Sequence, residues 1–274
     1  MRTLFTLFIL LIVLLILPLE SHPLPPSNET AAEALEQSPR HGEYVNVEFP
    51  DHDFSLNTWV VYPERPTRAP VIIVIHEIFG LTDWIRAIAD DLASEGYLAI
   101  APDFISGLGP GGGGTESFES QDDIIRTIRD LTPDEVIARL NAVRDYALTI
   151  PAATEHIATI GFCWGGTMSF YYATAQPDMH AAVVFYGTSP DTEHLSKIET
   201  PVLGLYAEDD ARVNVTIEPA RDEMNRLGKT FEYYIYPGAG HGFVRQQGGR
   251  DGANLSAAEQ AWEQMYVFLQ EYLD

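Results

Sequence analysis

The segment of this sequence best suited to chemistry is GFCWGG at residues 161–166, which contains Cys163, the single cysteine of the 274-residue chain. It falls between a predicted strand and a predicted helix, the context of a nucleophile elbow, G-x-S-x-G, with Cys in the serine position. Gly161 and Gly165 leave the space that such a strained turn needs. The thiol then points out at a helix N-terminus, where the helix dipole favours the thiolate, and the backbone N–H of Trp164 is placed to bind an oxyanion. The alternative interpretation is that Cys163 is only a small core residue of the turn.

An acid and a base follow Cys163 in the order that this elbow requires. Glu208, Asp209 and Asp210 come after one predicted strand, and His241 comes after the next in a glycine-flanked loop. A carboxylate that reaches one imidazole nitrogen fixes the tautomer of the ring and stabilises the imidazolium. The residues alone leave the choice among the three acids open, and the alternative for His241 is a histidine on the surface. Together these side chains predict nucleophilic attack on an acyl carbon.

Alternating strands and helices must position these residues. We predict strands at residues 44–49, 56–62, 71–75, 97–101, 157–161, 181–186, 202–207 and 231–236, the first two as an antiparallel pair at a sheet edge. We predict helices at residues 83–95, 167–175 and 217–227, and two more that begin at capping boxes, residues 132–135 and 256–259. This alternation predicts an α/β fold with a mainly parallel, doubly wound sheet and helices on both faces, in a single domain at residues 43–274.

The N-terminus predicts export. Met1 and Arg2 precede an apolar run at residues 4–19, and a basic start followed by an apolar stretch is typical of a signal peptide. The run is short for a spanning helix, which needs about 20 residues, so we expect residues 1–21 to be a cleaved signal, with an uncleaved membrane anchor as the alternative. Residues 22–42 are rich in Pro, Ser, Ala and Glu and predict a flexible tether. We therefore expect a periplasmic or secreted protein.

Charge and glycine content exclude several classes of function. The chain has 40 Asp and Glu against 16 Lys and Arg, a net charge of −24, which would repel nucleic acids and anionic lipid headgroups. The glycine-rich residues 107–114 lack the Gly-Lys-Ser/Thr of a phosphate-binding loop and predict a flexible surface loop, which can still hang over the active site. We expect no cofactor, no metal, no nucleic-acid partner and no membrane contact beyond an N-terminal anchor.

Three motifs together resemble the dienelactone hydrolase family: GFCWGG at residues 161–166, HEIFGL at residues 76–81 and GHGF at residues 240–243. The resemblance covers about residues 71–268. It implies an α/β-hydrolase fold in one domain and a Cys-His-Asp triad. The family pattern of an Asp three residues before a Val selects Asp210, with Val213, over Asp209.

The same resemblance implies roles for other residues. Glu77 helps to activate the thiol, the N–H of Ile78 is the second oxyanion donor beside that of Trp164, and Arg245 pairs with a substrate carboxylate. One departure matters, because well-known members of the family carry a second arginine where this sequence has Gly107. One contact to the carboxylate of dienelactone is therefore missing, and the resemblance implies a carboxymethylenebutenolidase-like hydrolase of esters or dienelactone-like lactones.

The function predicted from the sequence is hydrolysis of small carboxylic esters or lactones through an acyl-enzyme on Cys163, by a protein that we expect to be a monomer. Two alternatives stay open. One is a non-catalytic or redox-sensing homologue with a reactive lone cysteine, which does not require His241 and Asp210 in register. The other keeps the enzyme but replaces the small substrate with a polymer or peptide.

Overall fold

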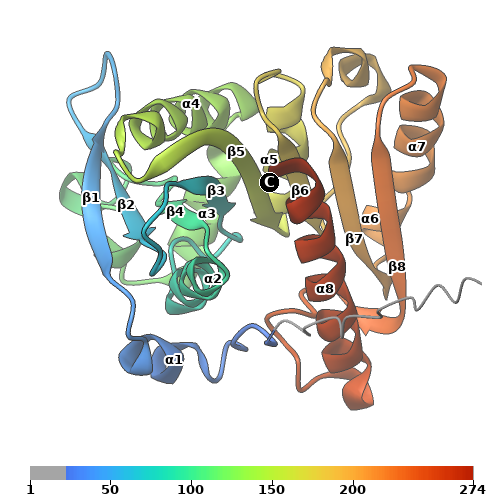
Figure 1. The fold of residues 1–274 in the computed structure, drawn as a ribbon, viewed down its shortest axis with the longest axis horizontal. Helices are drawn as coiled ribbons and strands as arrows, with labels where there is room; N and C mark the ends of the chain where they lie inside the picture. Colours follow the sequence, from blue (N-terminus) through green and yellow to red (C-terminus); the bar gives the residue numbers. More distant parts are fainter. Residues whose placement is uncertain (1–22, 274) are drawn as a thin grey trace, which may run out of the picture.

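The fold is built on one eight-stranded sheet with the strand order β1-β2-β4-β3-β5-β6-β7-β8 (Figure 1). The computed structural model describes residues 23–273, so the predicted signal lies outside the described residues. The strands are β1 (Gly42–Glu48), β2 (Ser55–Val61), β3 (Ala69–Ile75), β4 (Leu98–Pro102), β5 (Ala153–Phe162), β6 (Ala181–Phe185), β7 (Val202–Asp209) and β8 (Phe231–Gly240). Only the β1–β2 and β2–β4 pairings are antiparallel. The predicted mainly parallel sheet with an antiparallel pair at one edge is confirmed.

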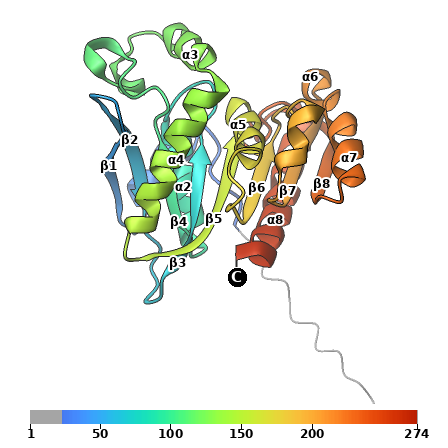
Figure 2. The ribbon, with the colours of Figure 1, turned by 90° about the horizontal axis from the view of Figure 1, so that it is seen from above.

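Helices cover both faces of this sheet (Figure 2). They are α1 (Ala31–Gln37), α2 (Asp83–Ser94), α3 (Gln121–Asp130), α4 (Pro133–Thr149), α5 (Trp164–Ala173), α6 (Ala211–Asn214), α7 (Ile217–Arg226) and α8 (Ala253–Leu273). Buried side chains of α1, α2 and α8 pack on one face, while those of α3, α4, α5 and α7 pack on the other. Both faces of the central strands are therefore buried, which explains why β3 reads as an unbroken apolar run.

Local signals account for several helix ends. Thr132 and Glu135 form the predicted capping box at the start of α4, with reciprocal hydrogen bonds between each side chain and the backbone of the other. The second predicted box is wrong, because α8 already begins at Ala253 and Ser256 lies within it. Asn254 explains the earlier start, since its side chain accepts from the N–H of Gly240 and donates to the carbonyl of Gln246.

The segment predicted as a tether is packed on the domain instead. Its helix α1 buries Ala31 against the face that also carries α2. The carbonyl of Pro26 accepts a hydrogen bond from the indole of Trp84, and that of Pro25 accepts one from Gln247. These partners lie 58 and 222 residues away along the chain, so the proline-rich composition gave no sign of the contacts.

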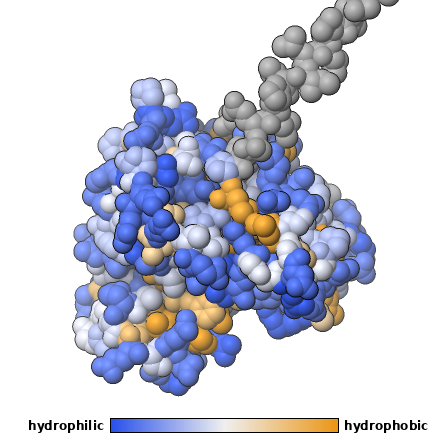
Figure 3. Space-filling model, turned by 90° about the horizontal axis from the view of Figure 1, so that it is seen from below, coloured by the Kyte–Doolittle hydropathy of each residue, from blue (hydrophilic) through white to orange (hydrophobic). Residues whose placement is uncertain are grey.

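The surface agrees with the acidic composition. Most side chains on the face drawn in Figure 3 are hydrophilic, and the hydrophobic areas on this face are small. Among residues 23–273, no helix has both the length and the apolar character that crossing a bilayer requires.

Candidate active site

Cys163 occupies the sharp turn between β5 and α5. Its backbone has φ 57° and ψ −115°, a left-handed conformation that costs free energy in a residue with a side chain and that is concentrated at functional sites. The turn is held on both sides, because the N–H of Cys163 donates to the carbonyl of Phe185 on β6 at 3.0 Å and its carbonyl accepts from Thr167 at 3.1 Å. The thiol is partly exposed at the helix N-terminus.

The two glycines of the elbow have no room for a side chain. A Cβ at Gly161 would lie 1.9 Å from the carbonyl oxygen of Gly165, and a Cβ at Gly165 would lie 2.2 Å from the carbonyl oxygen of Ile75. Both contacts are with backbone, which cannot move aside without shifting the strands. The close packing that the motif predicted therefore exists in the fold.

The three adjacent acids after β7 have different partners. Asp210 Oδ2 lies 2.5 Å from Nδ1 of His241, and Asp210 is buried. Asp209 instead pairs with Arg250 at 2.5 Å on the surface, and Glu208 accepts from the N–H of Gly238. The structure thus brings Asp210, and neither of its neighbours, to the imidazole.

The protonation of His241 depends on two neighbouring side chains, Asp210 and Cys163. Burial disfavours the imidazolium, but hydrogen bonds to Asp210 and to the side chain of Cys163 outweigh burial and raise the pKa of His241 to about 9. A proton held at this ring near neutral pH is available to a leaving oxygen. The side chains of Cys163, His241 and Asp210 thus influence one another in series, an arrangement of the kind that acyl transfer uses.

Two backbone amides of the predicted site have no acceptor within the described residues. The N–H of Trp164 is the first of α5 and has no partner within its helix, and the N–H of Ile78 lies in the turn after β3. Neither donates a hydrogen bond to another residue within the described part of the chain. These are the two predicted oxyanion donors.

His76 fixes the loop that carries Ile78. Its Nδ1–H donates to the carbonyl of Glu77 at 2.7 Å, and its Nε2 accepts from the N–H of Phe104 at 3.2 Å. The ring also stacks on Trp164 with 5.6 Å between centroids. Because both nitrogens are occupied and full burial lowers the pKa of His76, this histidine is a neutral support for the two amides and not a base.

Glu77, which is buried, and Arg245, which is partly exposed, form an ion pair. Glu77 Oε2 lies 2.7 Å from Nε of Arg245, whose guanidinium also lies over the ring of Phe79 at 4.9 Å. Burial raises the pKa of Glu77 to about 7, although the charges of Arg245 and His241 oppose this rise. The carboxyl of Glu77 can therefore exchange a proton near neutral pH, and Arg245 already has an anionic partner.

The structure explains why no second arginine stands at residue 107. Gly107 has φ +81°, and a Cβ there would lie 2.4 Å from the ring of Phe54. The glycine-rich loop that follows is exposed at its tip, and its far end is anchored by Thr115, which donates to Asp103 and accepts from the N–H of Leu81. The hollow beside the loop is lined by β1, β2 and loop residues, and by none of the triad.

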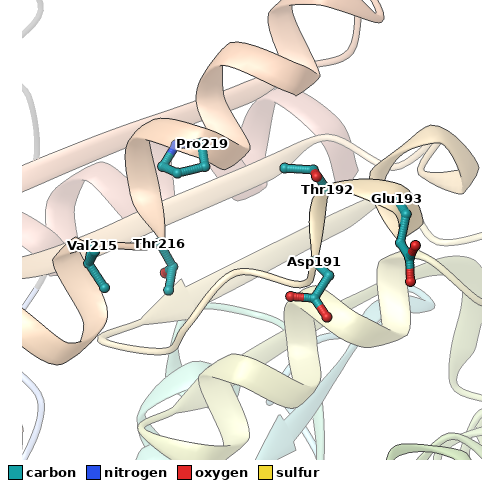
Figure 4. A pocket seen from close by; sticks show the side chains of 6 residues that line it. All are labelled: Asp191, Thr192, Glu193, Val215, Thr216 and Pro219. Atoms are coloured by element: carbon teal, nitrogen blue, oxygen red, sulfur yellow. The ribbon is translucent and has the colours of Figure 1, made fainter.

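A second hollow lies beyond the acid loop, between the β6–β7 connection and the start of α7. Its lining residues are labelled in Figure 4: Asp191, Thr192, Glu193, Val215, Thr216 and Pro219. Two carboxylates and no cation line it, so it is unsuited to an anionic substrate. Within residues 23–273, no three His, Cys, Asp or Glu side chains group closely enough to hold a metal ion.

Sequence reasoning did not assign a role to His76 or to Tyr186, the residue after β6. The ring of Tyr186 packs edge-on against His241 with 5.0 Å between centroids. A signal for His76 was its place directly before Glu77 at the end of a strand. Tyr186 had no such signal, because only the pairing of β6 with the elbow strand β5 places it beside the site.

Comparisons with known proteins show which family the chain resembles. Residues 56–273 match the Dienelactone hydrolase family. Proteins named "Putative carboxymethylenebutenolidase" from Escherichia coli (strain K12) and Saccharolobus solfataricus are each 30% identical to this chain, with 77% and 78% of this chain and 82% and 93% of those proteins covered. A crystal structure titled "Putative Dienelactone Hydrolase" from Klebsiella pneumoniae matches with a TM-score of 0.74 at 27% identity, and the match covers 85% of this chain and 99% of that one.

Proposed function

Because the chain belongs to the dienelactone hydrolase family, we propose that it hydrolyses small carboxylic esters or lactones through an acyl-enzyme on Cys163. The observation that carries the proposal is the pairing of His241 with Asp210 at 2.5 Å, close enough to Cys163 at the strained end of β5 for that side chain to raise the pKa of His241. The two unpaired amides beside it, at Ile78 and Trp164, support the same chemistry, since they match the donors that a tetrahedral oxyanion needs.

The first half of the reaction forms a thioester. Near neutral pH His241, with a pKa of about 9, holds the proton that Cys163 has lost. The thiolate attacks the acyl carbon while the carbonyl oxygen gains negative charge between the amides of Ile78 and Trp164. The bond from carbon to the leaving oxygen then breaks. That oxygen takes the proton from His241, whose charged form Asp210 stabilises.

The second half releases the acid. A water molecule gives a proton to His241 and attacks the thioester carbon, and the thiolate leaves as the carboxylic acid departs. Glu77 is a second proton acceptor for the thiol, because burial brings its pKa to about 7. A substrate anion that binds Arg245 competes with Glu77 for the guanidinium, and the loss of that counter-ion strengthens Glu77 as a base.

The proposal predicts that the purified chain hydrolyses small esters and lactones and that iodoacetamide stops it. Alkylation of the single thiol should proceed with the loss of activity in a one-to-one ratio, measured by mass spectrometry and by turnover on the same samples. A bound substrate analogue should slow both processes, because the reagent and the substrate compete for Cys163.

Two results would contradict the proposal. Activity that survives full alkylation would exclude a Cys163 nucleophile. An inactive protein whose thiol reacts readily with peroxide would favour the redox-sensing alternative, and turnover confined to peptides or polymers would place the substrate in another class.

This chain has Gly107 where well-known family members carry an arginine that binds a substrate carboxylate. We therefore predict that neutral substrates are hydrolysed at least as well as carboxylated ones. A charge-assisted hydrogen bond contributes about 1.5–3 kcal/mol, so the lost arginine should weaken preference for an anion about tenfold or more. The measurement is kcat/KM for a matched neutral and carboxylated pair. In Arg245→Ala the carboxylated member should lose about tenfold more than the neutral one, because only the anion uses the guanidinium.

Arg212→Ala serves as the matched control. Arg212 is exposed on α6, close in sequence to Asp210, and its removal should leave the ratio between the two substrates unchanged. A strong preference of the wild type for the carboxylated member would contradict the prediction. If that preference also fell in Arg212→Ala, this residue would be the replacement for the missing cation.

A further inference from the structure

Tyr186 has a buried hydroxyl beside the elbow that no other group satisfies. The residue is fully buried, and within residues 23–273 its hydroxyl has no hydrogen-bond partner. A buried donor without an acceptor lowers the stability of the fold, because folding removes its hydrogen bond to water and supplies no hydrogen bond within the protein. A buried group of this kind in a folded protein requires an explanation.

The fold places Tyr186 directly beside Cys163. Phe162 and Phe185 are paired on the parallel strands β5 and β6, so Cys163 and Tyr186 are the next residues on adjacent strands. Both leave the sheet with positive φ, 57° for Cys163 and 40° for Tyr186. A bulky residue in this region is strained, and strain of this kind is concentrated at active sites.

The surroundings of the hydroxyl define what it can do. The ring contacts His241 edge-on at 5.0 Å, and the side chain lies within electrostatic range of Glu77, Cys163 and Arg245. Burial raises the pKa of Tyr186 well above its ordinary value, so the hydroxyl keeps its proton and acts as a neutral donor. A neutral donor near two groups that become anionic stabilises their negative charge.

We propose that the hydroxyl of Tyr186 donates a hydrogen bond to the sulfur of Cys163 once the thiol has lost its proton. This inference rests on the proposed function, because it needs Cys163 as the nucleophile. The hydroxyl has no hydrogen-bond partner within residues 23–273, and a thiolate is a stronger acceptor than a thiol. A hydrogen bond to the sulfur therefore favours the thiolate over the thiol, and in this proposal Tyr186 is a catalytic residue that acts on the reacting atom.

The test is Tyr186→Phe, which keeps the ring contacts and removes only the hydroxyl. Cys163 is the single cysteine of the chain, so absorbance at 240 nm, with Cys163→Ala as the blank, reports the thiolate of this residue alone. We expect the apparent pKa of the thiol to rise by about one unit and alkylation by iodoacetamide to slow about tenfold at a pH below that pKa. The melting temperature should not fall, because an unsatisfied buried hydroxyl is removed.

Tyr236→Phe is the matched control. Tyr236 belongs to the same aromatic cluster, with its ring 5.5 Å from that of Phe243, and its buried hydroxyl also lacks a partner within the described residues. Tyr186 contacts Phe243 at 5.3 Å. The control should leave the thiol titration unchanged, since Tyr236 is not adjacent to the elbow.

Three results would overturn the inference. The first is a Tyr186→Phe titration that coincides with that of the wild type, and the second is an equal shift in Tyr236→Phe. The third is a shift that disappears in the Glu77→Gln background, which would mean that the hydroxyl acts on the carboxylate. Failure of the proposed function would look different, because the wild type itself would then hydrolyse no ester or would stay active after alkylation.

Discussion

Cys163→Ala is expected to lose ester hydrolysis by about 10,000-fold or more while it folds as the wild type does. Loss of the nucleophile of a triad typically removes several powers of ten from turnover, and the remaining groups leave only a residual rate. Alanine keeps the Cβ that the strained backbone at φ 57° already accommodates, so the elbow should not relax. The measurements are kcat/KM on a small ester and the thermal midpoint of unfolding.

Cys163→Ser sharpens this test. Serine supplies an oxygen nucleophile to the same His241 and Asp210, and the elbow motif is most often built around serine. We expect turnover well above that of Cys163→Ala but below that of the wild type, because the thiol loses its proton more easily than a hydroxyl. Wild-type turnover in the alanine variant would show that another group attacks the substrate.

The fold could be predicted from the sequence because its signals are local. The alternation of strands and helices, the capping box at Thr132 and the order of Cys163, Asp210 and His241 are each readable within a short segment. Contacts between distant segments are not. The packing of residues 23–40 on the domain depends on Trp84 and Gln247 as partners, and no pattern within the segment itself encodes them.

The residues of the site also fall into two groups, those that a local motif predicted and those whose surroundings only the fold reveals. The elbow glycines and the acid loop had motif signals, and the fold brings their residues together. The ion pair between Glu77 and Arg245 was not expected, because the family pattern assigned the arginine to the substrate. The buried hydroxyl of Tyr186 became visible only when β6 was placed beside β5. Such environments arise from tertiary packing, so a single sequence cannot reveal them.

Asp210→Asn is expected to lower turnover by about 1,000- to 10,000-fold, whereas Asp209→Asn should change it by no more than a few fold. The carboxylate of Asp210 holds Nδ1 of His241 at 2.5 Å, and an amide can neither stabilise the imidazolium nor enforce the same tautomer. Asp209 pairs with Arg250 where both side chains are about half exposed or more, at 63% and 49%. A pair of this kind contributes little, about 0–1 kcal/mol.

Asp210→Asn and Asp209→Asn should also differ in how their thermal midpoints of unfolding depend on pH. The pKa of His241 is raised to about 9 in the folded state, above the value of about 6.5 for an unfolded histidine. Its charged form therefore adds to the free energy of unfolding below pH 6.5, and this contribution is lost as the pH rises through about 9. The gap in thermal midpoint between wild type and Asp210→Asn should be widest near pH 6 and should narrow toward pH 10. Asp209→Asn should show no such narrowing, and equal behaviour of the two variants would mean that Asp210 does not set the charge of His241.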